Sequence, residues 1–286
     1  MTVYILVTVP DPQFYDACTL VFDSLRVGFP TATIRVTVNG LRTPARLHEK
    51  IFCRAFNAGA EVHVESDRIL HHAAWIRTTL EDHAEYESGP CVILDADIAF
   101  WSSCEGWKFD TLLAGYHVPL IWNDFAQCVS FERLHTSFLY VRDAGELFAR
   151  IETAYPNSHK RDGDYCPFDA FMPRVEFIHG IPFFYDSTAA LYAAIGGTHF
   201  GQQHKDCFTH LNSASFYEVM HERLENKAGF ENLHKVYAKE PVKYLRGWWG
   251  VVDQYYIEKY RQAVEFLDSL GQTGVPALRS LKVLLQ

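Results

Sequence analysis

Residues 91–101 have the sequence CVILDADIAFW, and this stretch decides the fold. Four apolar residues follow Gly89 and Pro90 and predict a short buried strand. The strand ends in two carboxylates, Asp95 and Asp97, and more apolar residues follow at once. Ionised carboxylates are costly at low dielectric unless they are paired or bind a metal. Solvated acids in a loop are the alternative, but the buried context favours a divalent cation such as Mg²⁺ or Mn²⁺.

Strands and helices alternate before this stretch. Spacing and turn residues predict strands at 3–9, 33–38 and 61–65, and helices at 11–28, 47–56 and 73–86. This alternation is typical of an α/β fold with a mainly parallel sheet. In such sheets ligands bind beyond the carboxyl ends of the strands, which is where Asp95 and Asp97 fall.

The second half of the chain is less regular. The same criteria predict strands at 115–122 and 137–141, a helix at 143–155, a polar loop at 156–167 and a hairpin at 175–185. A histidine-bearing segment, residues 196–210, follows the hairpin. From Phe216 the chain is predicted to be helical, and residues 278–285 form an amphipathic tail that caps the core or contacts a second copy.

The composition bounds the class of protein. The 286 residues are 48% hydrophobic and 15% aromatic, as expected for a well-packed globular chain. A net charge of −9 disfavours binding to duplex nucleic acid through a broad basic face. The 7 cysteines include no Cys-x-x-Cys pair, which favours a reduced setting over a disulfide framework. With no basic leader and no apolar run of membrane-spanning length, we expect a cytoplasmic protein.

The order of elements over residues 3–215, together with Asp95-Ala96-Asp97, resembles the GT-A glycosyltransferases. Three segments are similar to the branch of glycogenin and the lipopolysaccharide galactosyltransferases. Arg77 precedes the acidic strand, residues 136–141 resemble a strand beginning Asn-Ser-Gly, and residues 168–171 resemble an Asp-Gln-Asp-Ala-Leu segment. The Asn and Gly of the first motif are absent here, and Pro167 stands for the first Asp of the second.

The resemblance implies a Rossmann-like mixed sheet flanked by helices. Residues 1–215 would form the catalytic domain, with a nucleotide-binding half at 1–101 and an acceptor and metal half at 102–215. Residues 216–286 would form a helical C-terminal extension. The implied activity is metal-dependent transfer of a sugar from a nucleoside-diphosphate sugar to an acceptor hydroxyl.

The resemblance also implies the site residues. Mn²⁺ or Mg²⁺ would bind Asp95, Asp97 and one late histidine, with His210 first, His199 second and His204 third among the candidates. A carboxylate on the sugar side would act as a base in inversion or as a stabiliser in retention, with Asp169, Asp164 and Asp124 as candidates in that order. The residues expected to contact the donor are Thr8, Val9, Asp11, Arg77, Asp95, Ala96 and Lys205.

Donor, acceptor and stereochemistry stay open at this stage. Family frequency favours a UDP-sugar. The acceptor is a glycan, a lipid-linked sugar, a protein, a small molecule or a modified nucleobase, and a homodimer is left open.

Other classes use the same residues. A nucleotide-sugar binding protein without turnover would keep the same motif. A phosphatase of the haloacid dehalogenase type also follows a strand with Asp-x-Asp, but it requires Thr or Val where this chain has Ala99. His221 and Glu222 lack the second histidine of a zinc-protease motif, and no glycine-rich phosphate-binding motif is present.

Overall fold

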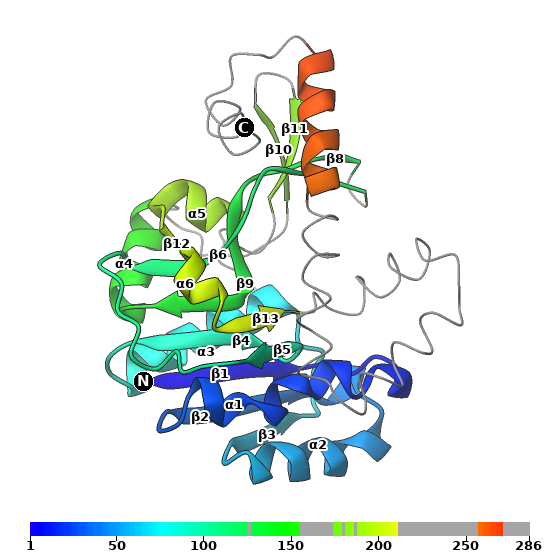
Figure 1. Cartoon of the computed structure of the whole chain (residues 1–286), viewed down its shortest axis with the longest axis vertical. Helices are drawn as coiled ribbons and strands as arrows, with labels where there is room; N and C mark the ends of the chain where they lie inside the picture. Colours follow the sequence, from blue (N-terminus) through cyan, green and yellow to red (C-terminus); the bar gives the residue numbers. More distant parts are fainter. Residues whose placement is uncertain (125–126, 155–173, 179–180, 186–187, 211–256, 271–286) are drawn as a thin grey trace.

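The computed structural model of the chain describes residues 1–124, 127–154, 174–178, 181–185, 188–210 and 257–270. Its centre is a seven-stranded mixed sheet with the strand order β12-β6-β9-β4-β1-β2-β3 (Figure 1). Neighbouring strands from β3 to β4 run parallel, whereas β9 runs antiparallel to both β4 and β6. The predicted α/β class with a mixed, Rossmann-like sheet is therefore confirmed.

The strands predicted around the acidic stretch are present. The bounds in the main sheet are Thr2–Val7 (β1), Thr33–Asn39 (β2), Glu61–Glu65 (β3), Cys91–Asp95 (β4), Leu113–Val118 (β6), Arg133–Val141 (β9) and Thr198–His199 (β12). The sequence VYILV within β1 is continuously apolar because the strand is covered on both faces. Alternate residues of β1 enter different cores, with Val3 and Ile5 on one side and Tyr4 on the other.

Helices cover both faces of this sheet. One core includes residues of α1 (Leu25–Gly28) and α2 (Ala45–Asn57), and the other includes residues of α3 (His72–Tyr86), α4 (Ala144–Ala154) and α5 (Ala189–Ile195). In α2 the residues Leu47, Ile51 and Ala55 are buried at a spacing of four, which places them on one stripe of the helix.

The predicted continuous helix at 11–28 is wrong. The chain instead forms 3₁₀ helices at Pro12–Phe14 and Ala17–Asp23 before the short α1. The Val21 N–H bonds to the Ala96 carbonyl oxygen at 2.9 Å, and this tertiary bond takes a donor that an α-helix would use internally. The single strand predicted at 115–122 is also wrong: β6 ends at Val118 and β7 (Ile121–Asn123) belongs to another sheet, with Pro119, which has no N–H, between them.

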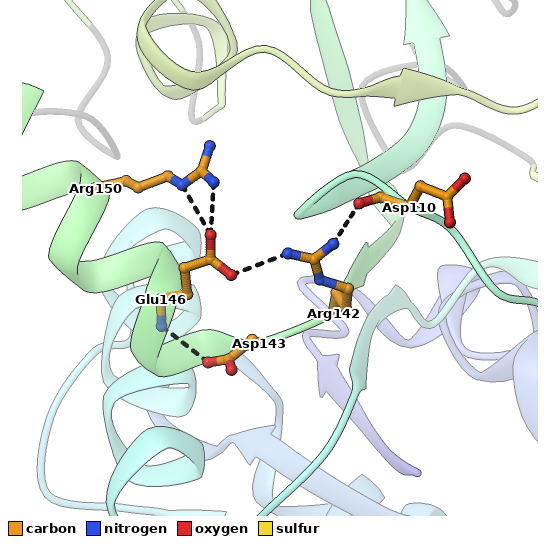
Figure 2. A network of polar contacts seen from close by, with 5 residues as sticks. All are labelled: Asp110, Arg142, Asp143, Glu146 and Arg150. Atoms are coloured by element: carbon orange, nitrogen blue, oxygen red, sulfur yellow. Dashed lines mark hydrogen bonds and ion pairs between the residues drawn. The ribbon is translucent and has the colours of Figure 1, made fainter.

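A polar network fixes the start of α4 (Figure 2). Asp143 Oδ1 accepts a hydrogen bond from the Glu146 N–H at 2.8 Å and caps the first turn. The Glu146 carboxylate accepts bonds from Arg142 at 2.9 Å and Arg150 at 2.5 Å, and Arg142 also donates to the Asp110 carbonyl oxygen. These side chains are exposed to solvent, which screens their charges, so the pairs mainly orient the start of the helix.

A second sheet has the order β10-β11-β8-β7 and includes the predicted hairpin, Arg174–Ile178 (β10) with Ile181–Tyr185 (β11). Its strand β8, Cys128–Ser130, was not predicted. A helix over residues 257–269 lies within the predicted C-terminal extension and packs Tyr260, Ala263 and Leu267 against this part of the core.

The proposed boundary between residues 215 and 216, the loop at 156–167 and the tail at 278–285 lie outside the described residues. Within the described parts of the chain, no helix is long and apolar enough to cross a membrane.

Candidate metal centre

The turn that carries the two acids is held from the side by the 3₁₀ segment. β4 ends at Asp95, and β5 (Ile98–Phe100) begins one residue after Asp97. The Val21 N–H holds the Ala96 carbonyl oxygen, and Ser24 Oγ accepts a bond from the Phe100 N–H at 2.8 Å. The turn is therefore bound at both ends, which limits how far its carboxylates move.

A two-stranded antiparallel ribbon brings His210 to this turn. β13 (Phe208–His210) pairs antiparallel with β5, and this register sets His210 opposite Ile98, next to Asp97. Phe208 is 1% exposed and packs against Phe100 and Phe138, which anchors the register. The pairing with β5 and the packing of Phe208 thus hold the His210 imidazole beside Asp97.

His210 lies close to both acids. His210 Nε2 lies 3.1 Å from Asp97 Oδ1 and 3.5 Å from Asp95 Oδ2. The side chains of His210 and Asp97 are 6% and 7% exposed, whereas that of Asp95 is 22% exposed. The centre is therefore enclosed on the Asp97 side and more open at Asp95.

The electrostatics of the cluster favour charged groups. Burial by itself lowers the pKa of His210, but the charges of Asp97 and Asp95 outweigh it and raise this pKa to about 10. Burial by itself raises the pKa of Asp95, and contacts with His210 and His72 outweigh it and hold this pKa well below its usual range. These shifts favour a protonated His210 ring beside an ionised Asp95.

Two further histidines, which the sequence did not single out, lie at the same centre. His72 Nε2 is 3.4 Å from Asp95 Oδ1, and the His135 ring is 5.0 Å from the His210 ring. The β4–β9 register pairs Leu94 with Phe138, and its continuation would set His135 opposite Asp97. The position of His135 depends on how β9 pairs with β4, and the sequence pattern of one strand does not reveal its pairing.

Ligand atoms of Asp95, His135 and His210 lie within 4.8 Å of one another, close enough for one ion. The chemistry of His135 is less suited to this role. The Ser137 N–H donates to His135 Nδ1 at 3.0 Å, so the neutral ring carries its proton on Nε2. Ligation through either nitrogen would require loss of that bond or movement of that proton, and a metal-bound histidine normally donates from its other nitrogen.

The expected base-binding loop follows β1. The β1–β4 register pairs Leu6 with Asp95, so Thr8 follows β1 at the same edge of the sheet as the acids. The Val9 side chain is fully buried and its N–H bonds to Thr43 Oγ1 at 3.1 Å. Asp11 is exposed, and its carbonyl oxygen accepts from the Phe14 N–H. The loop is thus anchored in the core by Val9.

The two expected cationic donor contacts lie on different elements. Arg77 is on α3, the helix that begins at His72, and its Nη2 lies 3.1 Å from Glu81 Oε2. Lys205 ends α6 (Gln202–Lys205), and its Nζ lies over the Tyr116 ring at 5.3 Å from the ring centre.

The structure does not bring His199 or His204 to the carboxylates. His199 lies on β12, three strands from β4, which corresponds to roughly 14 Å across a sheet. It stacks on His117 at 3.8 Å between ring centres, and burial together with the charge of His117 lowers its pKa to about 4. His204 packs against Trp107 at 4.7 Å, and its Nδ1 accepts from the Gly201 N–H.

Of the three candidate sugar-side carboxylates, only Asp124 is within the described residues, since Asp164 and Asp169 lie outside them. Asp124 is 53% exposed and pairs with Lys259 Nζ at 2.5 Å. The pair joins the end of β7 to the helix at 257–269.

No protein-family model and no curated protein match the chain. Among solved structures, a mannosyltransferase from Pyrobaculum calidifontis in complex with GDP-mannose and Mn²⁺ is similar at 11% identity and a TM-score of 0.38, over 99% of this chain and 78% of that one. A putative glucose-1-phosphate thymidylyltransferase from Bacillus anthracis, in complex with a sucrose, is similar at 8% identity and a TM-score of 0.36, over 77% and 93%. Both TM-scores are low, and the fold class above rests on the strand order of this chain itself.

Proposed function

We propose that the chain is a metal-dependent glycosyltransferase that uses a nucleoside-diphosphate sugar. The observation that carries this proposal is that His210 contacts both Asp95 and Asp97 at the carboxyl end of β4. Ligands of α/β sheets bind at that edge, and two acidic side chains grouped there favour a divalent cation. This arrangement supports the GT-A resemblance, including its metal site.

The residues fit a divalent cation. Two carboxylates and one imidazole suit Mn²⁺, and Mg²⁺ accepts the carboxylates with water in the remaining positions. Asp97 and His210 would hold the ion from the enclosed side and Asp95 from the open side. When bound, the cation supplies positive charge that stabilises the departing nucleoside diphosphate.

The surrounding residues would then bind and orient the donor. We assign the nucleoside to the loop from Thr8 to Asp11, with Ala96 beside it, and extra positive charge near the diphosphate to Arg77 and Lys205. The sugar-side carboxylate remains Asp169, then Asp164, with Asp124 third because it already pairs with Lys259. A UDP-sugar is the favoured donor, and the acceptor is any of the hydroxyl-bearing classes named above.

A thermal-shift and calorimetric screen tests the proposal. Nucleoside diphosphates and their sugars are added with and without Mn²⁺, and a ligand that binds the folded state alone raises the melting temperature with its concentration. We expect binding that requires Mn²⁺ and that Asp97→Asn abolishes. Asp82→Asn is the matched control, because Asp82 is exposed and lies on α3 ten residues after His72, about 15 Å further along the helix.

Product analysis separates the remaining classes. A transferase or its donor-hydrolysis side reaction yields free nucleoside diphosphate, whereas a nucleotide-sugar binding protein yields none. Absence of any metal-dependent nucleotide binding, together with hydrolysis of phosphate esters, would replace the proposal with the phosphatase alternative.

A further inference from the structure

His72 lies against the more exposed acid of the metal centre. Its Nε2 is 3.4 Å from Asp95 Oδ1. α3 leads from β3 to β4, which run parallel in the same sheet, so its first turn lies at the edge of the sheet where both strands end. His72, the first residue of α3, therefore contacts Asp95 from an element that is not part of the β4–β5 turn.

The orientation of His72 is set by its own helix. Its ring stacks on Trp75 at 6.1 Å between ring centres with an interplanar angle of 17°. Trp75 is 5% exposed and packs in the core between the sheet and α3. The His72 side chain is 37% exposed, and stacking on the buried indole restrains its ring with Nε2 towards Asp95.

The two oxygens of Asp95 have different neighbours. Oδ1 faces His72, and Oδ2 faces His210 at 3.5 Å. A carboxylate that ligates a metal is commonly held by a hydrogen bond to its other oxygen, and this bond fixes which oxygen the metal receives.

We propose that His72 is a positioning residue that holds Asp95 through Oδ1 and so presents Oδ2 to the cation. This inference rests on the proposed metal-dependent function, because it assigns a role at the same site. His72 would donate from Nε2, act through Asp95 and not ligate the ion itself.

The experiment measures Mn²⁺ affinity of the full chain by calorimetry, with no donor present. We expect His72→Ala to weaken Mn²⁺ binding about 10–100-fold, the usual effect of removing such a partner. His72→Gln should restore most of the affinity, because the Gln amide nitrogen reaches about as far as His Nε2. His72→Asn should not, because its amide is one methylene shorter.

The neighbouring His71 is the matched control, since it is exposed and immediately precedes α3. His71→Ala should bind Mn²⁺ like the wild type, and metal-free melting temperatures show which variants are folded. The proposal is overturned if His72→Ala binds Mn²⁺ normally, or if His72→Gln is as weak as His72→Asn. Failure of the wild type to bind any divalent cation would instead overturn the proposed function and this role with it.

Discussion

Binding of Mn²⁺ should expel a proton from His210. In the metal-free protein burial opposes the charged imidazole, but Asp97 and Asp95 raise its pKa to about 10. The ring is therefore protonated near neutral pH, and a metal ligand must be deprotonated. One proton should leave for each ion bound, so apparent affinity should rise tenfold per pH unit, or roughly 100-fold between about pH 6.5 and 8.5.

Calorimetry in two buffers of similar pKa but different ionisation enthalpy counts the released protons. We expect about one per ion for the wild type and none from this source for His210→Gln. Asp97→Asn removes the largest charge that raises the His210 pKa and should lower the count as well as the affinity. A wild-type affinity that is flat over this pH range would refute His210 as a metal ligand.

The raised pKa of His210 also makes the stability of the metal-free protein depend on pH. Because the His210 pKa is higher in the folded state, its contribution to stability is fully present below the unfolded value of 6.5. This contribution is lost as the pH rises through about 10. The lowered pKa of Asp95 has its effect at acidic pH. Its contribution to stability is present above the unfolded value of 3.8 and is lost as the pH falls below it. Urea unfolding without metal should therefore show a larger difference between wild type and His210→Gln at about pH 6 than at about pH 10.

Two substitutions test the packing. Gly28→Ala should destabilise the protein by about 1–3 kcal/mol in urea unfolding, because the added Cβ would lie 2.5 Å from the Phe100 ring. Gly106→Ala is the control and should be nearly neutral, because nothing lies within 4 Å of its added Cβ. Asp124→Ala should cost about 1–2 kcal/mol because it removes the carboxylate paired with the buried Lys259, and adding Lys259→Met should recover part of the loss. Equal effects of the two glycine substitutions, or an unchanged midpoint for Asp124→Ala, would contradict these assignments.

Much of the main sheet could be predicted from local pattern. The buried strands are apolar throughout, and the breakers Gly89 and Pro90 mark where β4 begins. The position of Asp95 and Asp97 at the carboxyl end of a parallel strand follows from that pattern together with the alternation of strands and helices. The departures occur where tertiary bonds or proline intervene, as with the Val21 N–H and Pro119.

The arrangement of the candidate metal centre was harder to predict from the sequence. His210 was favoured because small polar residues follow it, and its approach to Asp97 depends on a β5–β13 pairing that is nonlocal. His72 and His135 were missed as members of the cluster for the same reason. His72 is placed by the start of α3 at the sheet edge and His135 by the register of β9, and neither leaves a local motif.

The antiparallel contact of β5 with β13 also bears on how the chain folds. Asp97 and His210 are the ends of a loop of about 110 residues, whose closure costs on the order of 4 kcal/mol of chain entropy. Contacts of such long sequence separation form slowly, after the local helices and the first parallel pairs. During refolding, Mn²⁺ binding should therefore recover late, and its recovery would report when the β5–β13 pair has formed.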